Sequence, residues 1–274
     1  MKILVAVKQV AQLRDDFVPP AAGADDGAVV LSAGALQWSA NDWDAFSLEA
    51  ALALRDGALR DRRDDVEVVA VTVGDERSEP ALRAALAIGA ERAIRVWDEA
   101  LDVTSDGADP LSVARLLAAV AEAESPQLIL CGAQSADMAN AATGVALAGL
   151  LDYAHVAVVS AIERDGEQLT VQRELEDGAV ELLRISLPVL LTVQTGINAP
   201  RRPNLRAIKH ARAADLTVLG LDELGLDGDA PATAAGARTA GLYARPAGGA
   251  ETLEGSPAEI AASIAAIVGK ALGS

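Results

Sequence analysis

The chain has 274 residues, enough for one large domain or two smaller ones around a substantial core. Its formal net charge of −17 argues against nucleic acids and anionic membrane surfaces as partners, because both would repel an acidic protein. Hydrophobic residues make up 51% of the chain but aromatic residues only 3%, so the core is expected to be aliphatic. A single cysteine, Cys131, rules out a disulfide framework and a CxxC metal site.

The amino-terminal sequence carries no recognisable targeting or membrane-spanning segment. Residues 1–10 lack the long apolar region and small-residue cleavage site of a signal peptide. No uncharged apolar stretch approaches the ~20 residues that a membrane-spanning helix needs. We therefore expect a cytoplasmic protein with no membrane span.

The first 150 residues alternate between strand-like and helix-like patterns. Short apolar runs predict strands at 2–7, 66–73, 93–97 and 128–131. Helical spacing predicts helices over 42–54, 80–88 and 111–123, and another that begins at Thr143. The helix at 42–54 is expected to be capped by Ser39 or Asn41 and to end at residues 55–57. The segment 9–36 is expected to be a loop, with a small hairpin around 28–31. This alternation predicts a doubly wound, mainly parallel α/β sheet.

The pattern changes after residue 150. Four strands are expected at 156–162, 169–175, 180–187 and 189–193, with Asp-Gly turns at 165–166 and 177–178. They form either an antiparallel meander or a hairpin that flanks a return to the main sheet. Pro188 must then lie at a strand boundary or an edge, because it cannot donate a ladder hydrogen bond.

The carboxyl-terminal quarter is expected to form an extension. The basic segment 198–212 is interpreted as a loop followed by a short helix, and 221–256 as an arm poor in periodicity. An amphipathic helix follows at 257–272, and such a helix beyond a long arm needs a surface to pack on. We therefore predict an α/β domain at 1–220, and an arm and helix at 221–274 that pack on a partner chain.

Several kinds of chemistry have little support in the sequence. There is no GxSxG motif, and His155 and His210 lie in unrelated segments, which argues against a hydrolase. No pair of His or Cys residues has metal-ligand spacing. The dinucleotide fingerprint GxGxxG and the phosphate-binding GxxxxGK[ST] loop are also absent.

Small and polar residues nevertheless gather where three predicted parallel strands end. These ends are residues 6–8, 73–75 and 132–144, and Asn41 at a helix start can join them. In a doubly wound sheet, ligands bind at the carboxyl ends of strands near the switch in strand order. Small residues let the backbone approach an adenine and ribose, and Thr143 at a helix start can offer a hydroxyl and an amide to phosphate. The alternative is a set of ordinary strand–helix turns.

Several segments resemble the β subunit of electron-transfer flavoprotein, over roughly residues 1–220. They include AVKQV at 6–10, the Asn41-containing helix start with its later Glu-Ala pair, and VTVG at 71–74. The most specific segment is VQRELEDGAVELLRISLPVLLTV at 171–193, which has the family's basic residue, acidic-Gly turn, Glu and Leu-Pro. TGINAPRRPNLRAI at 195–208 is similar to the family's Asn-x-Pro-Arg segment and recognition loop.

The resemblance implies a function in electron transfer. The β subunit would pair with an α subunit that carries most contacts to FAD, and it would bury an adenine nucleotide, usually AMP. Electrons would come from an acyl-CoA dehydrogenase or another dehydrogenase and pass to a quinone oxidoreductase. The chain would be an electron carrier subunit and not an enzyme by itself.

The resemblance also assigns residues to these roles. The residues implied for the nucleotide are Ala6, Asn41, Asp42, Trp43, Asp44, Val73, Gly74, Asp137, Asn140, Ala141, Ala142, Thr143 and Gly144. The residues implied for docking the dehydrogenase are Pro203, Leu205, Arg206, Ile208 and Lys209. In the second set, an apolar tip at Leu205 anchors the partner and the surrounding cations steer it.

Departures from the family pattern define two alternatives to this reading. Some relatives bind a second FAD in place of AMP and bifurcate electrons, using a loop similar to DGDTxQVG, and this chain lacks the Gly-Asp-Thr-x-Gln run. AMP is therefore favoured over a second FAD. Leu13 stands where the family often has an aromatic residue beside the flavin ring, so the resemblance does not imply a flavin contact from that side. A free-standing, stress-type adenine-nucleotide-binding module is the other alternative, but it would have no use for the tail at 230–274.

Overall fold

The computed structural model describes residues 1–17, 33–60, 65–101, 109–226 and 252–273. Contacts divide these residues into two units. The larger unit contains all the strands and the helices up to α5, and the smaller one contains helix α7. The predicted hairpin around 28–31 and most of the predicted arm at 221–256 lie outside the described residues.

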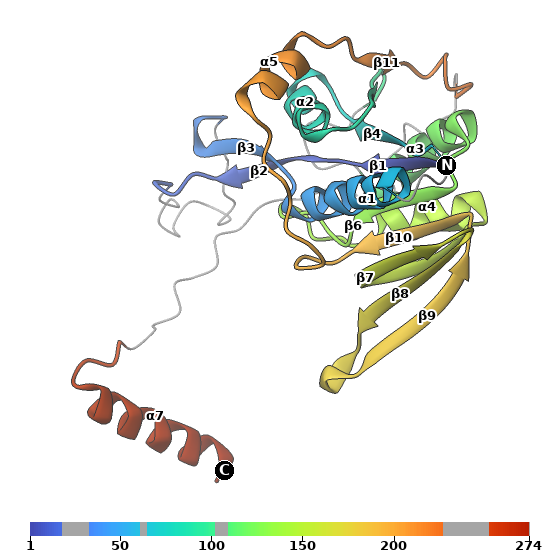
Figure 1. Cartoon of the computed structure of the whole chain (residues 1–274). Coiled ribbons are helices and arrows are strands. Elements are labelled where there is room, and N and C mark those ends of the chain that lie inside the picture. The colour runs from blue at the N-terminus through green and yellow to red at the C-terminus, as the bar shows by residue number, and fades with distance from the viewer. Residues whose placement is uncertain (18–32, 61–64, 102–108, 227–251, 274) are drawn as a thin grey trace. The chain divides into compact units, whose positions relative to one another are not determined.

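The larger unit is a mainly parallel sheet with helices on both faces (Figure 1). Its strands are β1 Lys2–Ala6, β2 Gln9–Leu13, β3 Leu36–Ala40, β4 Glu67–Val73, β5 Arg92–Val96, β6 Leu128–Gly132, β7 Ala154–Asp165, β8 Gln168–Glu174, β9 Val180–Ser186, β10 Val189–Val193 and β11 Thr217–Leu219. Its helices are α1 Asp42–Arg60, α2 Glu79–Ile88, α3 Pro110–Glu124, α4 Thr143–Leu151 and α5 Leu205–Ala213, with short 3-10 turns η1 Ala33–Ala35, η2 Glu76–Ser78 and η3 Glu176–Gly178.

The order of the main sheet is β11-β5-β4-β1-β6-β10-β7-β8-β9. Strands β11 to β7 in this order pair in parallel, whereas β7, β8 and β9 pair antiparallel. The prediction of a doubly wound, mainly parallel sheet with an antiparallel extension is therefore confirmed. Of the two arrangements left open after residue 150, the return to the main sheet is correct, because β10 inserts between β6 and β7.

The two faces of the sheet carry separate aliphatic cores because successive strand residues point to opposite sides. Ile3 and Val5 of β1 pack with Leu48 of α1 and Leu82 of α2 on one face. On the other face, Leu4 packs with helices α3 and α4. Central strands buried on both faces explain why these segments are continuous apolar runs and do not alternate with polar residues.

Two predictions about the first 60 residues are wrong. Helix α1 continues past residues 55–57 to Arg60, because a single glycine inside a helix costs only ~1 kcal/mol and packing outweighs it. The segment 9–36 is not a loop throughout, because β2 pairs antiparallel with β3 as a separate two-stranded ribbon. Strand β2 is difficult to predict because its sequence, QVAQL, mixes polar and apolar residues.

Helix α7, Pro257–Leu272, confirms the predicted final helix. Its start has a reciprocal cap, since the Ser256 side chain accepts from the Glu259 amide and the Glu259 side chain accepts from the Ser256 amide. None of the described helices is long and apolar enough to cross a membrane.

Candidate functional site

The candidate site lies at the carboxyl ends of β1, β4 and β6. Strand β1 has β4 on one side and β6 on the other. The chain builds outward from β1 to β4 and β5 before it crosses to β6, so the strand order switches between β1 and β6. Three predicted residues, Ala6, Val73 and Gly74, therefore reach the same edge of the sheet, beside the start of the β6–α4 loop.

Asp44, in the first turn of α1, joins the ends of two strands. Its carboxylate accepts a hydrogen bond from the Lys8 amide, just past β1, at 2.7 Å, and another from the Gly132 amide, at the end of β6, at 3.2 Å. The side chain is buried, with Asp44 only 7% exposed. Burial raises the pKa of the Asp44 carboxyl from 3.8 to about 7, although hydrogen bonds from Lys8, Asn41 and Gly132 lower it in part.

Gly132 is required by the close approach of α1 to the end of β6. A Cβ atom at this position would lie 2.7 Å from Cβ of Trp43 and would collide with Oδ1 of Asp44. Trp43 is also held from a second side, since its indole N–H donates to the Gln194 side chain at 3.3 Å. The predicted residues Trp43 and Asp44 thus pack directly against the end of β6 at Gly132, while Asp42 is exposed at the helix start.

Asn41 fixes the loop that follows β6. Its side-chain amide donates to the Gln134 carbonyl at 3.0 Å, and its side-chain oxygen accepts from the Ala136 amide at 3.1 Å. The prediction that Asn41 or Ser39 caps α1 through its side chain is therefore wrong. The side-chain oxygen of Asn41 accepts from the loop at Ala136, whereas its main-chain carbonyl accepts from the amides of Asp44 and Ala45, and Ser39 lies within β3.

The loop 133–142 and the start of α4 form the open side of the site. The predicted residues Asn140, Ala141 and Ala142 are exposed, and Ala139 and Ala141 have φ of +51°. Thr143 begins α4 and is half-buried, and Ala142 before it provides no side-chain cap for the first helix amides. The α4 amides therefore lack the side-chain acceptor that an N-terminal cap usually supplies.

Lys8 and Asp137 meet across this loop. The Lys8 ammonium donates to Oδ1 of Asp137 at 2.7 Å and to the hydroxyl of Ser135 at 3.3 Å. Burial alone would raise the pKa of the Asp137 carboxyl, but the hydrogen bonds from Lys8 and Ser135 outweigh it and hold the pKa below its ordinary value. Sequence reasoning placed Lys8 at the strand end but did not assign it a role, because its contact with Asp137 spans 129 residues.

Packing at the start of α4 is close. A Cβ atom on Gly144 would lie 2.7 Å from the Thr192 methyl group of β10, so glycine lets the helix approach the sheet. Cys131 lies beside it and is buried, and burial raises the pKa of its thiol to about 12. Because a thiol with this pKa stays protonated at neutral pH, Cys131 acts as a packing residue and not as a nucleophile.

The predicted docking residues lie together on a separate surface, at the start of α5. Leu205 is the first residue of that helix and is 85% exposed. Asn204 caps the helix by accepting from the Ala207 amide. Arg206 and Lys209 are exposed, whereas Pro203 and Ile208 are half-buried.

The segment before α5 is anchored to α1. Arg201 donates to the Glu49 carboxylate through its amide at 3.0 Å, its Nε at 2.8 Å and its Nη2 at 2.9 Å. Its Nη1 lies 3.0 Å from Oδ2 of Asp56. This anchor was not predicted from the sequence. The feature that could have indicated it is Glu49, an acidic residue on the otherwise apolar face of α1.

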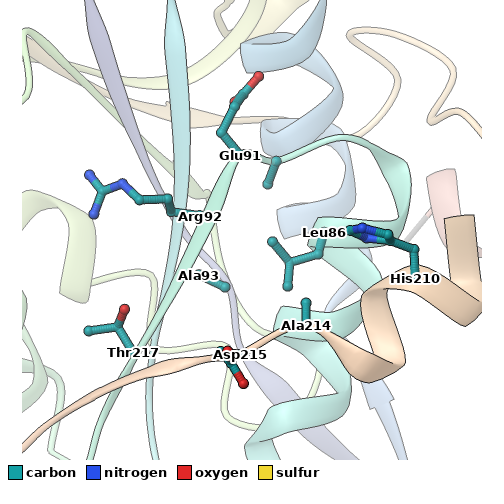
Figure 2. Close-up of a pocket in the computed structure, with 9 residues that line it drawn as sticks. Leu86, Glu91, Arg92, Ala93, His210, Ala214, Asp215 and Thr217 are labelled. Carbon is teal, nitrogen blue, oxygen red and sulfur yellow. The ribbon is translucent and has the colours of Figure 1, made fainter.

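A small cavity of about 180 Å³ lies away from the strand ends, between α2, β5, the end of α5 and β11 (Figure 2). Its lining includes Leu86, Arg92 and His210 but none of the predicted nucleotide residues. Ligand sites are usually larger, about 300–1,000 Å³. Within the described residues, no group of three or more His, Cys, Asp or Glu side chains could hold a metal ion.

Fold and strand-end geometry define this chain as a doubly wound, Rossmann-like α/β protein. A family model described as "Electron transfer flavoprotein domain" matches residues 28–224. The chain is 38% identical to the electron transfer flavoprotein subunit beta of Methylophilus methylotrophus over 98% of both chains. It is 34% identical to the human subunit beta over 83% of this chain and 84% of the human one. The chain belongs to the electron transfer flavoprotein β subunit family.

Proposed function

We propose that the chain pairs with an α subunit, shares a redox FAD with it, and carries electrons from a dehydrogenase to a quinone oxidoreductase or similar acceptor. In this proposal it is a carrier subunit of the cytoplasm and not an enzyme on its own. The observation that carries the proposal is the match to the β subunit family, which covers nearly the whole chain.

The geometry of the strand ends supports AMP as the ligand of this subunit. The exposed loop leads to helix amides without a side-chain cap, and such amides favour a phosphate through their partial positive charge. Small residues at 141, 142 and 144 let a nucleotide approach the backbone. The absence of the Gly-Asp-Thr-x-Gln run favours AMP over the second FAD of bifurcating relatives.

Docking of the dehydrogenase, an acyl-CoA dehydrogenase of fatty acid β-oxidation or another class, is assigned to Leu205 and its surroundings. An 85% exposed leucine flanked by Arg206 and Lys209 supplies an apolar anchor with steering charges. Residues 221–274 are proposed to pack on the α subunit, because α7 presents apolar residues at helical spacing outside the larger unit.

Electron flow through the purified heterodimer tests the proposal. The chain is co-expressed with the α subunit of its organism, and flavin bleaching is followed after addition of a candidate dehydrogenase with its substrate, or of NADH. Reduction by the dehydrogenase and not by NADH is the expected result. Rapid reduction by NADH, with two flavins per heterodimer, would instead support the electron-bifurcating alternative.

A further inference from the structure

Lys8 connects three segments of the candidate nucleotide site. Its amide donates to Asp44 at 2.7 Å, and its carbonyl accepts from the Asn41 amide at 2.9 Å, which ties the end of β1 to the start of α1. Its ammonium reaches in the other direction, to Asp137 and Ser135 on the loop 133–142. One residue thus carries both a main-chain link to the helix and a side-chain link to the loop.

The inner and outer parts of this loop are held differently. The inner part is fixed by the Ala133 amide, which donates to the Val193 carbonyl. The Asn41 side chain also holds it, because it donates to the Gln134 carbonyl and accepts from the Ala136 amide. Among the hydrogen bonds of the described residues, the Lys8 ammonium provides the outermost side-chain tie between the loop and the rest of the domain. Residues 138–142 lie beyond it and are exposed.

The Asp137 carboxylate connects this tie to the outer loop. Oδ1 of Asp137 accepts from both the Lys8 ammonium and the Met138 amide, each at 2.7 Å. The side chain of Asp137 is 20% exposed, and that of Lys8 is 45% exposed. The shared oxygen Oδ1 links the Lys8 ammonium to the main chain at Met138, just before Ala139 and Ala141 adopt positive φ.

We propose that Lys8 is a positioning residue that holds the outer part of loop 133–142 in a nucleotide-ready conformation through its pair with Asp137. This inference rests on the proposed binding of an adenine nucleotide at these strand ends. A loop ordered before binding leaves less conformational entropy to lose when the ligand enters. The effect concerns the whole nucleoside, because the loop is ordered whether or not a phosphate is present.

The test uses the full heterodimer stripped of nucleotide, with AMP and adenosine titrated separately by calorimetry. Lys8→Met is expected to weaken both ligands by the same factor, about fivefold for a partly exposed pair. Asp137→Asn is expected to give the same loss, and the double variant no further loss, because both changes remove one interaction. Lys8→Arg is expected to restore most of the affinity.

Lys2→Met is the matched control. Lys2 lies at the opposite end of β1 and pairs with Glu124 at 2.7 Å, so this variant also removes a lysine and breaks an ion pair of the same strand. It is expected to leave both affinities unchanged. Melting temperatures of all variants separate a loss of affinity from a loss of folded protein.

Three outcomes would overturn the inference. Unchanged affinity in Lys8→Met, with an intact wild-type site, would show that the pair does not position the loop. A loss for AMP but not for adenosine would assign the ammonium to direct phosphate contact. A wild-type heterodimer that binds neither ligand would overturn the proposed nucleotide site, and this inference with it.

Discussion

Asp44 and Asn41 show how individual polar residues act at the strand ends. Both were predicted from the family resemblance to contact the nucleotide, and the structure directs their side chains to backbone groups of this chain. Their buried hydrogen bonds fix where β1, β6 and the loop 133–142 lie. Any contribution of these side chains to a ligand therefore operates through the backbone that they position.

Replacing Asp44 with Asn should change how stability depends on pH. The folded-state pKa of Asp44 is raised from 3.8 to about 7, so its contribution is fully present below about pH 4 and is lost as the pH rises through 7. Relative to Asp44→Asn, the wild-type chain should therefore lose on the order of 1 kcal/mol of unfolding free energy per pH unit between pH 4 and 7. Urea unfolding of both proteins at pH 5, 6, 7 and 8 measures the difference, and parallel pH curves would contradict it.

At the residue scale, the sequence predicted which strand ends meet at the candidate site but not the hydrogen bonds between them. Strand ends and small residues are local patterns, and they correctly brought Ala6, Val73, Gly74 and residues 132–144 to one edge. Asp44 bonds Gly132 at a separation of 88 residues, Asn41 bonds Ala136 at 95, and even Lys8 is 36 residues from Asp44. Local pattern reasoning has no access to such pairings.

At the scale of elements, α5 is presented by anchors on both sides. Arg201 binds Glu49 and Asp56 before the helix, and Arg83 of α2 donates to the carbonyls of Ala211, Arg212 and Ala214 at its end. An exposed tip on an anchored helix loses little conformational freedom when a partner binds. This arrangement suits a docking element and explains why the basic segment is not a flexible tail.

Leu205→Ala should therefore weaken docking of the electron-donating dehydrogenase. Truncating an exposed anchor at the centre of a small interface should cost about 1–2 kcal/mol, equivalent to roughly a tenfold loss of affinity. The rate of flavin reduction at limiting dehydrogenase concentration measures this loss. Leu111→Ala, which changes an exposed leucine on α3, serves as the control. Equal rates in wild type and Leu205→Ala would remove this residue from the docking surface.

Element prediction succeeded where a run was long and periodic and failed where tertiary contacts decided the outcome. The central strands follow directly from apolar runs and α3 from helical spacing, and the structure adds a cap at Asp109 with Pro110 as the first helical residue. Strand β11 is only three residues long and exists because it pairs with β5. The ribbon of β2 and β3 likewise depends on a pairing between segments more than 20 residues apart.

At the scale of the whole molecule, the chain is organised for a partnership. The larger unit carries both the candidate site at the strand ends and helix α5, whereas α7 belongs to a separate unit. The net charge of −17 makes the basic segment 198–212 a local exception. Such a contrast can orient an approaching acidic partner surface at long range.

The nucleotide content of the purified heterodimer tests the central claim most directly. After denaturation, the released flavin and adenine nucleotides are separated and counted against protein. One FAD and one AMP per heterodimer is the predicted result. Two FAD and no AMP would contradict it.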